Sequence, residues 1–218
     1  MHGMGGDDKP VRMWKGCIRP LAKADLRMAE IIHDLGNHLP KLYIVKDPFE
    51  ALLRAILHQA VRAQQSTENV TKLKNLFGGN FPRPIQILTI PSSRLKDIGL
   101  SGSQVNSVRT LARSVLDKKI DLGGLGLLRD EEVVSQLREL PGIGTWSAQM
   151  FLVFHLGRSD VLMVTDSSLA KATMKVFGLD HIPSVSELET IFAKFIPYRS
   201  AAAWYVWKKG GEFTPGLH

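Results

Sequence analysis

Two glycines in the stretch Leu140-Pro141-Gly142-Ile143-Gly144-Thr145 are spaced as in a tight turn that could bind an anion. Apolar residues at helical spacing lie on both sides of this stretch, so we expect a turn between two helices. Glycine at both special positions would let backbone N–H groups point outward at the start of the second helix, which suits a DNA phosphate. An ordinary helix corner can also contain Gly-x-Gly, so this spacing leaves both interpretations open.

One carboxylate, Asp166, lies at the predicted start of a later helix, after Val164-Thr165 and before Ser167-Ser168-Leu169. Aspartate is favoured at helix N-caps because its side chain accepts backbone N–H groups there. The same position would also present an acid at the mouth of a helix, where it could stabilise positive charge in a substrate. Taken alone, the position favours the cap.

The elements that must position these residues are helical almost throughout. Apolar residues recur at helical spacing after residues 26, 47, 104, 132, 145, 167 and 184, and Ser184 with Glu187 forms a capping-box pattern. Only residues 41–45 and 160–164 have the pattern of short extended segments. We therefore expect one compact, all-α unit of about ten helices, preceded by a flexible tail over residues 1–18.

Composition narrows the classes of protein further. The net charge of +7 and the isoelectric point near 9.6 suggest a polyanion as partner. A single cysteine, Cys17, excludes an internal disulfide, a four-cysteine iron–sulfur cluster and a zinc knuckle. No apolar run is long enough for a membrane helix, and the first residues lack the apolar region of a signal peptide. The sequence therefore predicts an intracellular, soluble protein.

The full stretch Leu-Pro-Gly-Ile-Gly followed by Thr-Trp-Ser-Ala (residues 140–148) resembles the helix-hairpin-helix (HhH-GPD) DNA glycosylases. Three other stretches are similar to the monofunctional alkylpurine (3-methyladenine) branch of that superfamily. They are Phe49-Glu50 through Arg54-Ala55-Ile56 to Gln59, Asp160-Val161 leading to Asp166, and Pro197-Tyr198-Arg199-Ser200 leading to Trp207. The resemblance runs from about residue 20 to residue 209.

This resemblance implies a two-lobed helical fold with the active site between the lobes. The middle lobe would span residues 47–155, and the second lobe residues 19–46 plus 156–218. Asp166 matches the catalytic aspartate of the family. Cleavage of the N-glycosidic bond of an alkylated purine requires only this one carboxylate, for the following reason. The carboxylate would stabilise the oxocarbenium-like sugar and orient the attacking water, while an alkylated, cationic purine departs without a general acid.

The resemblance also implies a base pocket lined by Trp146, Met150, Ser167 and Trp207, of which Met150 and Ser167 stand where the bacterial enzyme has tyrosine. Aromatic faces would hold a flipped cationic base by stacking and cation–π attraction. In the bifunctional glycosylase/lyases the position of Trp146 is a lysine that forms a Schiff base. We therefore expect no abasic-site lyase activity.

The implied DNA-binding face comprises the hairpin, the end of the first family helix and a turn, with these residues: Gly142, Gly144, Thr145, Gln59, Ala60, Ser101 and Ser103. Ala60 departs from the family because relatives place a leucine or glutamine wedge there. Ser103-Gln104 likewise replaces a basic pair. The family further implies a sodium or potassium ion held by hairpin carbonyls, which would be those of Leu140 and Ile143; we expect no other cofactor.

We therefore expect a monomeric, monofunctional glycosylase that excises alkylated purines from damaged duplex DNA, in the nucleus of a eukaryote or the cytoplasm of a bacterium. Two alternatives stay open. The missing wedge and the less aromatic pocket favour a module that binds lesions without excising them, whereas Asp166 disfavours it. The other alternative is a glycosylase for a different damaged purine.

Overall fold

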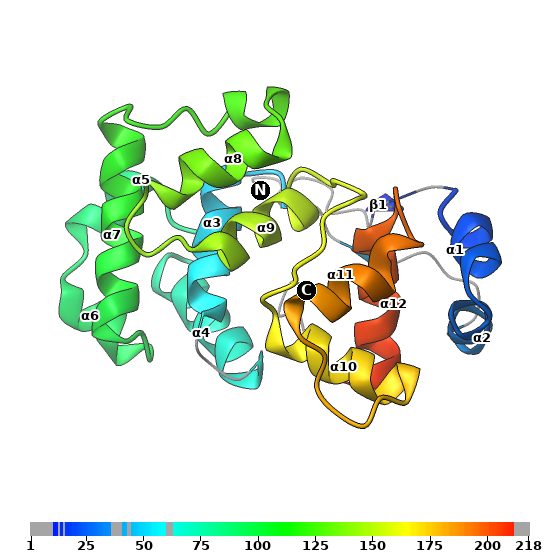
Figure 1. The fold of residues 1–218 in the computed structure, drawn as a ribbon. Coiled ribbons are helices and arrows are strands. Elements are labelled where there is room, and N and C mark those ends of the chain that lie inside the picture. The colour runs from blue at the N-terminus through cyan, green and yellow to red at the C-terminus, as the bar shows by residue number, and fades with distance from the viewer. Residues whose placement is uncertain are drawn as a thin grey trace, which may run out of the picture.

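The structure, a computed structural model, describes residues 11–12, 14, 16–35, 41–42, 45–59 and 63–211. Within these residues all regular secondary structure is helical except for one two-stranded ladder (Figure 1). The strands β1 (Val11–Arg12) and β2 (Lys41–Leu42) pair antiparallel, with Val11 opposite Leu42. The expected all-α fold class is confirmed.

The helices pack in two groups that lie on opposite sides of Figure 1. The first group contains α3 (Pro48–His58), α4 (Ala63–Leu76), α5 (Pro84–Thr89), α6 (Ser92–Asp97), α7 (Gly102–Leu116), a 3-10 turn (Gly124–Leu127), α8 (Asp130–Arg138) and α9 (Thr145–Phe154). The second contains α1 (Ile18–Ala24), α2 (Leu26–Asp34), α10 (Ser167–Phe177), α11 (Val185–Ala193) and α12 (Arg199–Gly210). This grouping agrees with the two lobes expected from the sequence, whose boundaries stay a prediction.

Local capping explains where the helices that matter for the site begin. Asp47 accepts the backbone N–H groups of Phe49 and Glu50 (2.7 and 3.0 Å), which starts α3 with Pro48 at its first position. Ser184 and Glu187 form the predicted capping box of α11. The apolar face of α3 is fully buried, so this helix is the centre of the first group.

Two sequence expectations need correction. The flexible tail was predicted too long, because Trp14 and Cys17 are 7% and 0% exposed and the Trp14 indole donates to the Gly157 carbonyl (3.2 Å). The segment 160–164 is not a strand. Its Val161 exchanges two hydrogen bonds with the Ser200 side chain instead of pairing with another strand. Tyr43 and Ile44 of the other expected strand lie outside the described residues.

None of the described helices is long and apolar enough to cross a bilayer.

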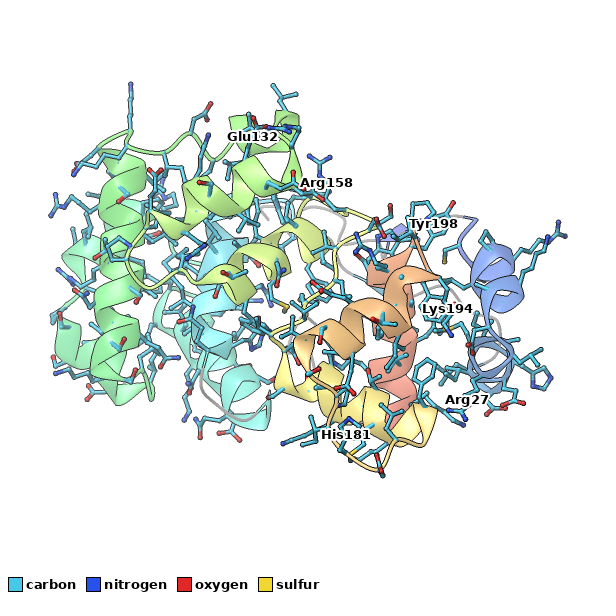
Figure 2. The ribbon with its side chains drawn as sticks, viewed as in Figure 1. Arg27, Glu132, Arg158, His181, Lys194 and Tyr198 are labelled. Carbon is cyan, nitrogen blue, oxygen red and sulfur yellow. The ribbon has the colours of Figure 1, made fainter. Side chains whose placement is uncertain are left out.

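A charged cluster fixes the turn between α10 and α11, where Figure 2 labels His181. The His181 ring lies between the carboxylates of Asp180 and Glu187, at 2.7 Å from Nδ1 and 2.9 Å from Nε2. These two hydrogen bonds raise the pKa of His181, and the bond with Asp180 has the larger effect. The Ser184 backbone and side chain, with His181, lower the pKa of Glu187 to about 2.

A histidine whose pKa is raised by folding stabilises the fold below its unfolded pKa of about 6.5, and loses that contribution as the pH rises through the folded value. We therefore expect His181→Gln to lower the melting temperature at about pH 6 and to lower it less at about pH 8.5. Thermal unfolding of both proteins at the two pH values measures this. A difference that is the same at both pH values would contradict the assignment.

Candidate active site

Asp166 is the N-cap of α10 and is also bonded to the helix that leaves the hairpin. Its Oδ1 accepts the Leu169 backbone N–H (2.8 Å) and the Ser168 hydroxyl. Its Oδ2 accepts the indole Nε1–H of Trp146 (2.6 Å). The cap interpretation is therefore correct as local structure. A catalytic role remains compatible with it, because each carboxylate oxygen can accept more than one hydrogen bond.

The other residues expected in the base pocket are distributed unevenly around this carboxylate. Trp146 and Met150 lie one turn apart on the same face of α9 and are half-buried, and Ser167 is exposed beside Asp166. Trp207 is 3% exposed and belongs to the hydrophobic core. The structure thus joins Trp146 directly to Asp166, whereas the contribution of Trp207 to a pocket stays a prediction.

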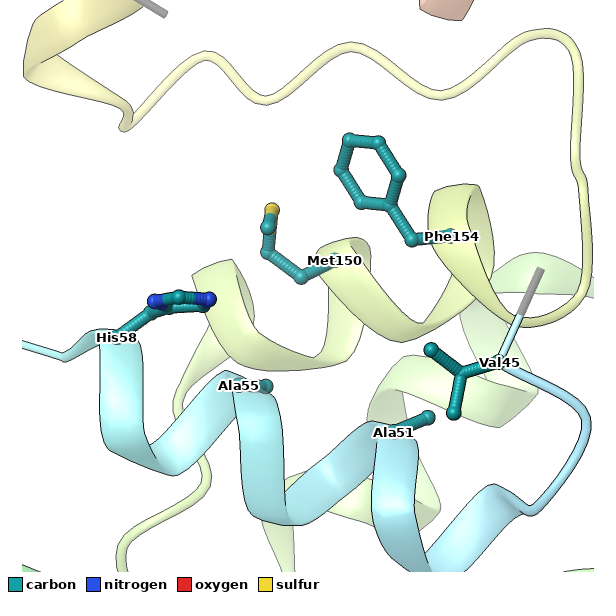
Figure 3. A pocket seen from close by; sticks show the side chains of 6 residues that line it. All are labelled: Val45, Ala51, Ala55, His58, Met150 and Phe154. Carbon is teal, nitrogen blue, oxygen red and sulfur yellow. The ribbon is translucent and has the colours of Figure 1, made fainter. Parts of the chain in front are cut away.

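Met150 lines a small hollow between α3 and α9 (Figure 3). The hollow has a volume of about 10 Å³, room for about one water molecule and far less than a purine needs. Its walls are the side chains of Val45, Ala51, Ala55, His58, Met150 and Phe154. This hollow would therefore accept a flipped base only if Met150 or another wall residue moved.

His58 is the one polar side chain in that wall. Its burial, together with the nearby Arg54, lowers its pKa to about 4. The imidazole is therefore neutral at physiological pH, and this wall presents no positive charge to a cationic base. Sequence reasoning could not predict this pKa, because a lone histidine at the end of an apolar helix face is equally compatible with an exposed position.

The hairpin between α8 and α9 has the predicted position, but its two glycines do different things. Gly142 has φ +85°, and a Cβ there would lie 1.8 Å from the Ser107 hydroxyl of α7. Gly144 is the N-cap of α9 in an extended conformation, with open space where a Cβ would be. Glycine is thus required at Gly142 for conformation and packing, whereas at Gly144 it leaves the surface of the helix N-terminus uncovered.

Two glutamines tie the three segments expected to face DNA to one another. Gln59 Nε2 donates to the Gly142 carbonyl (2.8 Å) and to the Ser147 hydroxyl (2.6 Å). Gln104 Nε2 donates to the carbonyls of Ile56 and Gln59 (3.1 and 3.3 Å). Both amide hydrogens of Gln59 are therefore used inside the protein, so a contact with DNA would have to use its other atoms.

The remaining residues expected to bind DNA lie at two helix N-termini. Ser101 caps α7, where its hydroxyl oxygen accepts the Gln104 N–H (3.2 Å), and Ser103 is exposed in the first turn. Thr145 is the first residue of α9. Helix N-termini attract anions, so both sites suit phosphate. Ala60 lies outside the described residues.

The hairpin carbonyls have the chemistry that an alkali cation requires, since they are hard, neutral oxygen donors. The Leu140 carbonyl accepts the Ile143 N–H (3.0 Å), which leaves one of its lone pairs for a cation. Among the described residues no cluster of acidic, histidine or cysteine side chains could hold a metal ion. A cation would thus be bound by Leu140 and Ile143 through the backbone alone.

The segment that carries Asp166 is held from behind by the start of α12. Arg199 forms a bidentate ion pair with Asp160 (2.8 and 2.9 Å) and also donates to its carbonyl (3.0 Å). The Ser200 N–H donates to the Ser159 carbonyl (3.0 Å). The motifs Asp160-Val161 and Arg199-Ser200, which the sequence singled out separately, are therefore two halves of one contact, which we call the Asp160–Arg199 clamp.

We expect Arg199→Lys to destabilise the protein by about 1 kcal/mol, because lysine keeps the charge but cannot donate two parallel hydrogen bonds. Urea unfolding measures the loss. Arg129→Lys is the matched control, since the ion pair of Arg129 with Glu132 is exposed (78% and 43%) and should contribute little. Equal effects of the two substitutions would contradict the importance of the clamp.

The two hairpin glycines give a second prediction. Gly142→Ala should destabilise the fold by about 2 kcal/mol or more, because its Cβ collides with Ser107 and its φ is left-handed. Gly144→Val should leave the melting temperature nearly unchanged and weaken binding to damaged and undamaged duplexes by similar factors, because it obstructs phosphate and not a base. Circular dichroism and fluorescence anisotropy measure the two effects. A loss of affinity confined to damaged DNA would place Gly144 in the base pocket.

The chain is similar to known proteins in sequence and in structure. The family model described as "HhH-GPD superfamily base excision DNA repair protein" matches residues 53–198. The "alkylbase DNA glycosidase-like protein mag2" of Schizosaccharomyces pombe is 26% identical over 208 residues, covering 94% of this chain and 95% of the relative. "DNA-3-methyladenine glycosylase 1" of the same yeast is 26% identical and covers 88% of each chain.

A solved structure is similar over the same range. The S. pombe 3-methyladenine DNA glycosylase Mag1, in complex with abasic DNA, superposes with a TM-score of 0.80 at 26% identity. The superposition covers 88% of this chain and 95% of that one. The family match covers more than half of the chain and includes the hairpin, Asp160 and Asp166. This chain belongs to the HhH-GPD superfamily of base excision DNA repair proteins.

Proposed function

We propose that this protein is a monofunctional DNA glycosylase that excises alkylated purines of the 3-methyladenine type from duplex DNA and leaves an abasic site. The observation that carries the proposal is the Asp166 carboxylate, which is fixed at the N-terminus of α10 by the helix that leaves the hairpin. A DNA-binding turn and a positioned acid are thus joined by one hydrogen bond.

The reaction requires little beyond these two parts. The N-termini of α7 and α9 would bind backbone phosphates and so hold the duplex beside Asp166. The Asp166 carboxylate would stabilise the positive charge that develops on the sugar as the glycosidic bond breaks, and would accept a proton from the attacking water. A cationic purine needs no general acid to depart.

Comparisons support this substrate class. One S. pombe relative is named an alkylbase DNA glycosidase-like protein and the other a DNA-3-methyladenine glycosylase, and the superposed structure contains abasic DNA. The side chain of Trp146 has no amine, so it cannot form a Schiff base with the sugar, which supports a hydrolase without lyase activity. A monovalent cation on the carbonyls of Leu140 and Ile143 would strengthen phosphate binding at the hairpin.

A second candidate is recognition of lesions without excision. Two observations favour it: both oxygens of Asp166 are engaged within the protein, and the hollow beside Met150 is too small for a base. Incubation with duplexes that carry different lesions, followed by alkali, separates the candidates. Strand breaks at an alkylated purine support the proposed function, breaks at another lesion reassign the substrate, and binding without breaks supports recognition alone.

Asp166→Asn should lower single-turnover excision by about a hundredfold or more, because it removes the charge that stabilises the transition state. Asparagine is as good an N-cap as aspartate, so we expect α10 and the melting temperature to change little. Affinity for duplex DNA should be equal or higher. An Asn variant with the wild-type excision rate would make Asp166 a helix cap only.

A further inference from the structure

We propose that Trp146 is a positioning residue for Asp166, and that its indole N–H sets the orientation in which the carboxylate faces the sugar and the attacking water. This inference rests on the proposed function, in which Asp166 is the catalytic carboxylate. It assigns to Trp146 a role that stacking against a base would not require.

The hydrogen bonds of Asp166 hold its carboxylate from two sides. Trp146 donates to Oδ2 at 2.6 Å, whereas the start of α10 donates to Oδ1 through the Leu169 N–H and the Ser168 hydroxyl. The two oxygens turn together about the Cβ–Cγ bond, and the cap contacts restrain that rotation only through donors of α10 itself. The indole restrains the same rotation at the other oxygen from a second helix, α9, so the plane of the carboxylate is held relative to the hairpin as well as to α10.

The indole can do this without giving up its stacking surface. Its N–H lies in the plane of the ring, and a base would stack on the face perpendicular to that plane. Trp146 is half-buried, so part of its surface remains accessible beside Met150. The edge of the ring can therefore hold the acid while a face remains for the base.

The bond also links the position of the acid to the hairpin. Trp146 is the second residue of α9, two residues after the Gly144 cap that we expect to face phosphate. Asp166 is fixed to this helix at one end and, through the Asp160–Arg199 clamp, to α12 behind it. Engagement of the hairpin by DNA therefore places the sugar at a defined distance from Oδ2.

Loss of the N–H should affect the rate and spare the affinity. A hydrogen bond to a charged group typically contributes enough that its loss corresponds to about a ten- to hundredfold change. Misplacement of a catalytic group by about 1 Å has effects of similar size. Phosphate binding at the hairpin does not involve this bond, so affinity for undamaged duplex should stay within about twofold.

The first test is Trp146→Phe, which keeps an aromatic face and removes the N–H. We expect single-turnover excision to fall about ten- to hundredfold on a lesion that the wild type excises, with affinity for the same duplex nearly unchanged. Trp14→Phe is the matched control, because it removes an indole hydrogen bond to a carbonyl, that of Gly157, away from Asp166. It should lower the melting temperature and leave excision unchanged well below that temperature.

The second test reads the contact directly. The chain has four tryptophans, so the 15N-labelled protein gives four indole N–H cross-peaks. Trp146→Phe identifies the relevant one by its disappearance. In Asp166→Asn, that cross-peak should move strongly and the other three little, because an amide replaces the carboxylate that accepts the N–H.

The outcomes separate the two proposals. A normal excision rate in Trp146→Phe, equal losses of rate and affinity, or an unmoved cross-peak in Asp166→Asn would each overturn the positioning role. If the wild-type protein excises no base, the proposed function fails. The cross-peak then still decides whether Trp146 holds the carboxylate.

Discussion

The hydrogen bond from the Trp146 indole to the Asp166 carboxylate joins the two groups of helices at the candidate active site, and the proposed chemistry depends on it. It connects the N-terminal turn of α9, which follows the hairpin, to the N-cap of α10, which belongs to the second group. A buried or half-buried carboxylate needs hydrogen-bond donors. The donors to Asp166 are the Leu169 backbone N–H, the Ser168 hydroxyl and the Trp146 indole N–H. The bond can form only while the starts of α9 and α10 keep their mutual position.

Two further sets of contacts maintain that position. On the side of the first group, Gln59 holds the hairpin to the end of α3, and Gln104 holds α7 to the same point. On the side of the second group, Arg199 and Ser200 hold the approach to Asp166. Each is a polar contact between segments distant in sequence, and each uses a side chain whose geometry permits two simultaneous hydrogen bonds.

The sequence predicted what depends on local rules. The helical fold class, the capping box of Ser184 and Glu187, the place of the hairpin and the position of Asp166 at a helix start follow from periodicity, glycine and capping residues, and the structure confirms them. The segment 160–164 was predicted as extended from its run of apolar residues. That pattern does not show that Ser200, at the start of α12, provides the hydrogen bonds to the Val161 backbone in place of a neighbouring strand. Gln59 was expected to face DNA, since its type and place do not show that Gly142 and Ser147 use both of its amide hydrogens. The burial of Trp207 and His58 likewise depends on helices that pack from elsewhere in the chain.

The clamp between Asp160 and Arg199 also has a consequence for the order in which the protein becomes functional. During synthesis the N-terminus of a chain emerges from the ribosome first, and domains begin to fold as their residues emerge. Helices α3 to α9, which include the hairpin, precede Asp166, and α12 emerges last among the described helices. The backbone of residues 159–161 lacks its partners at Arg199 and Ser200 until then. A nascent or prematurely terminated chain that ends before α12 would thus contain the DNA-facing hairpin without the contacts that hold the segment leading to its acid.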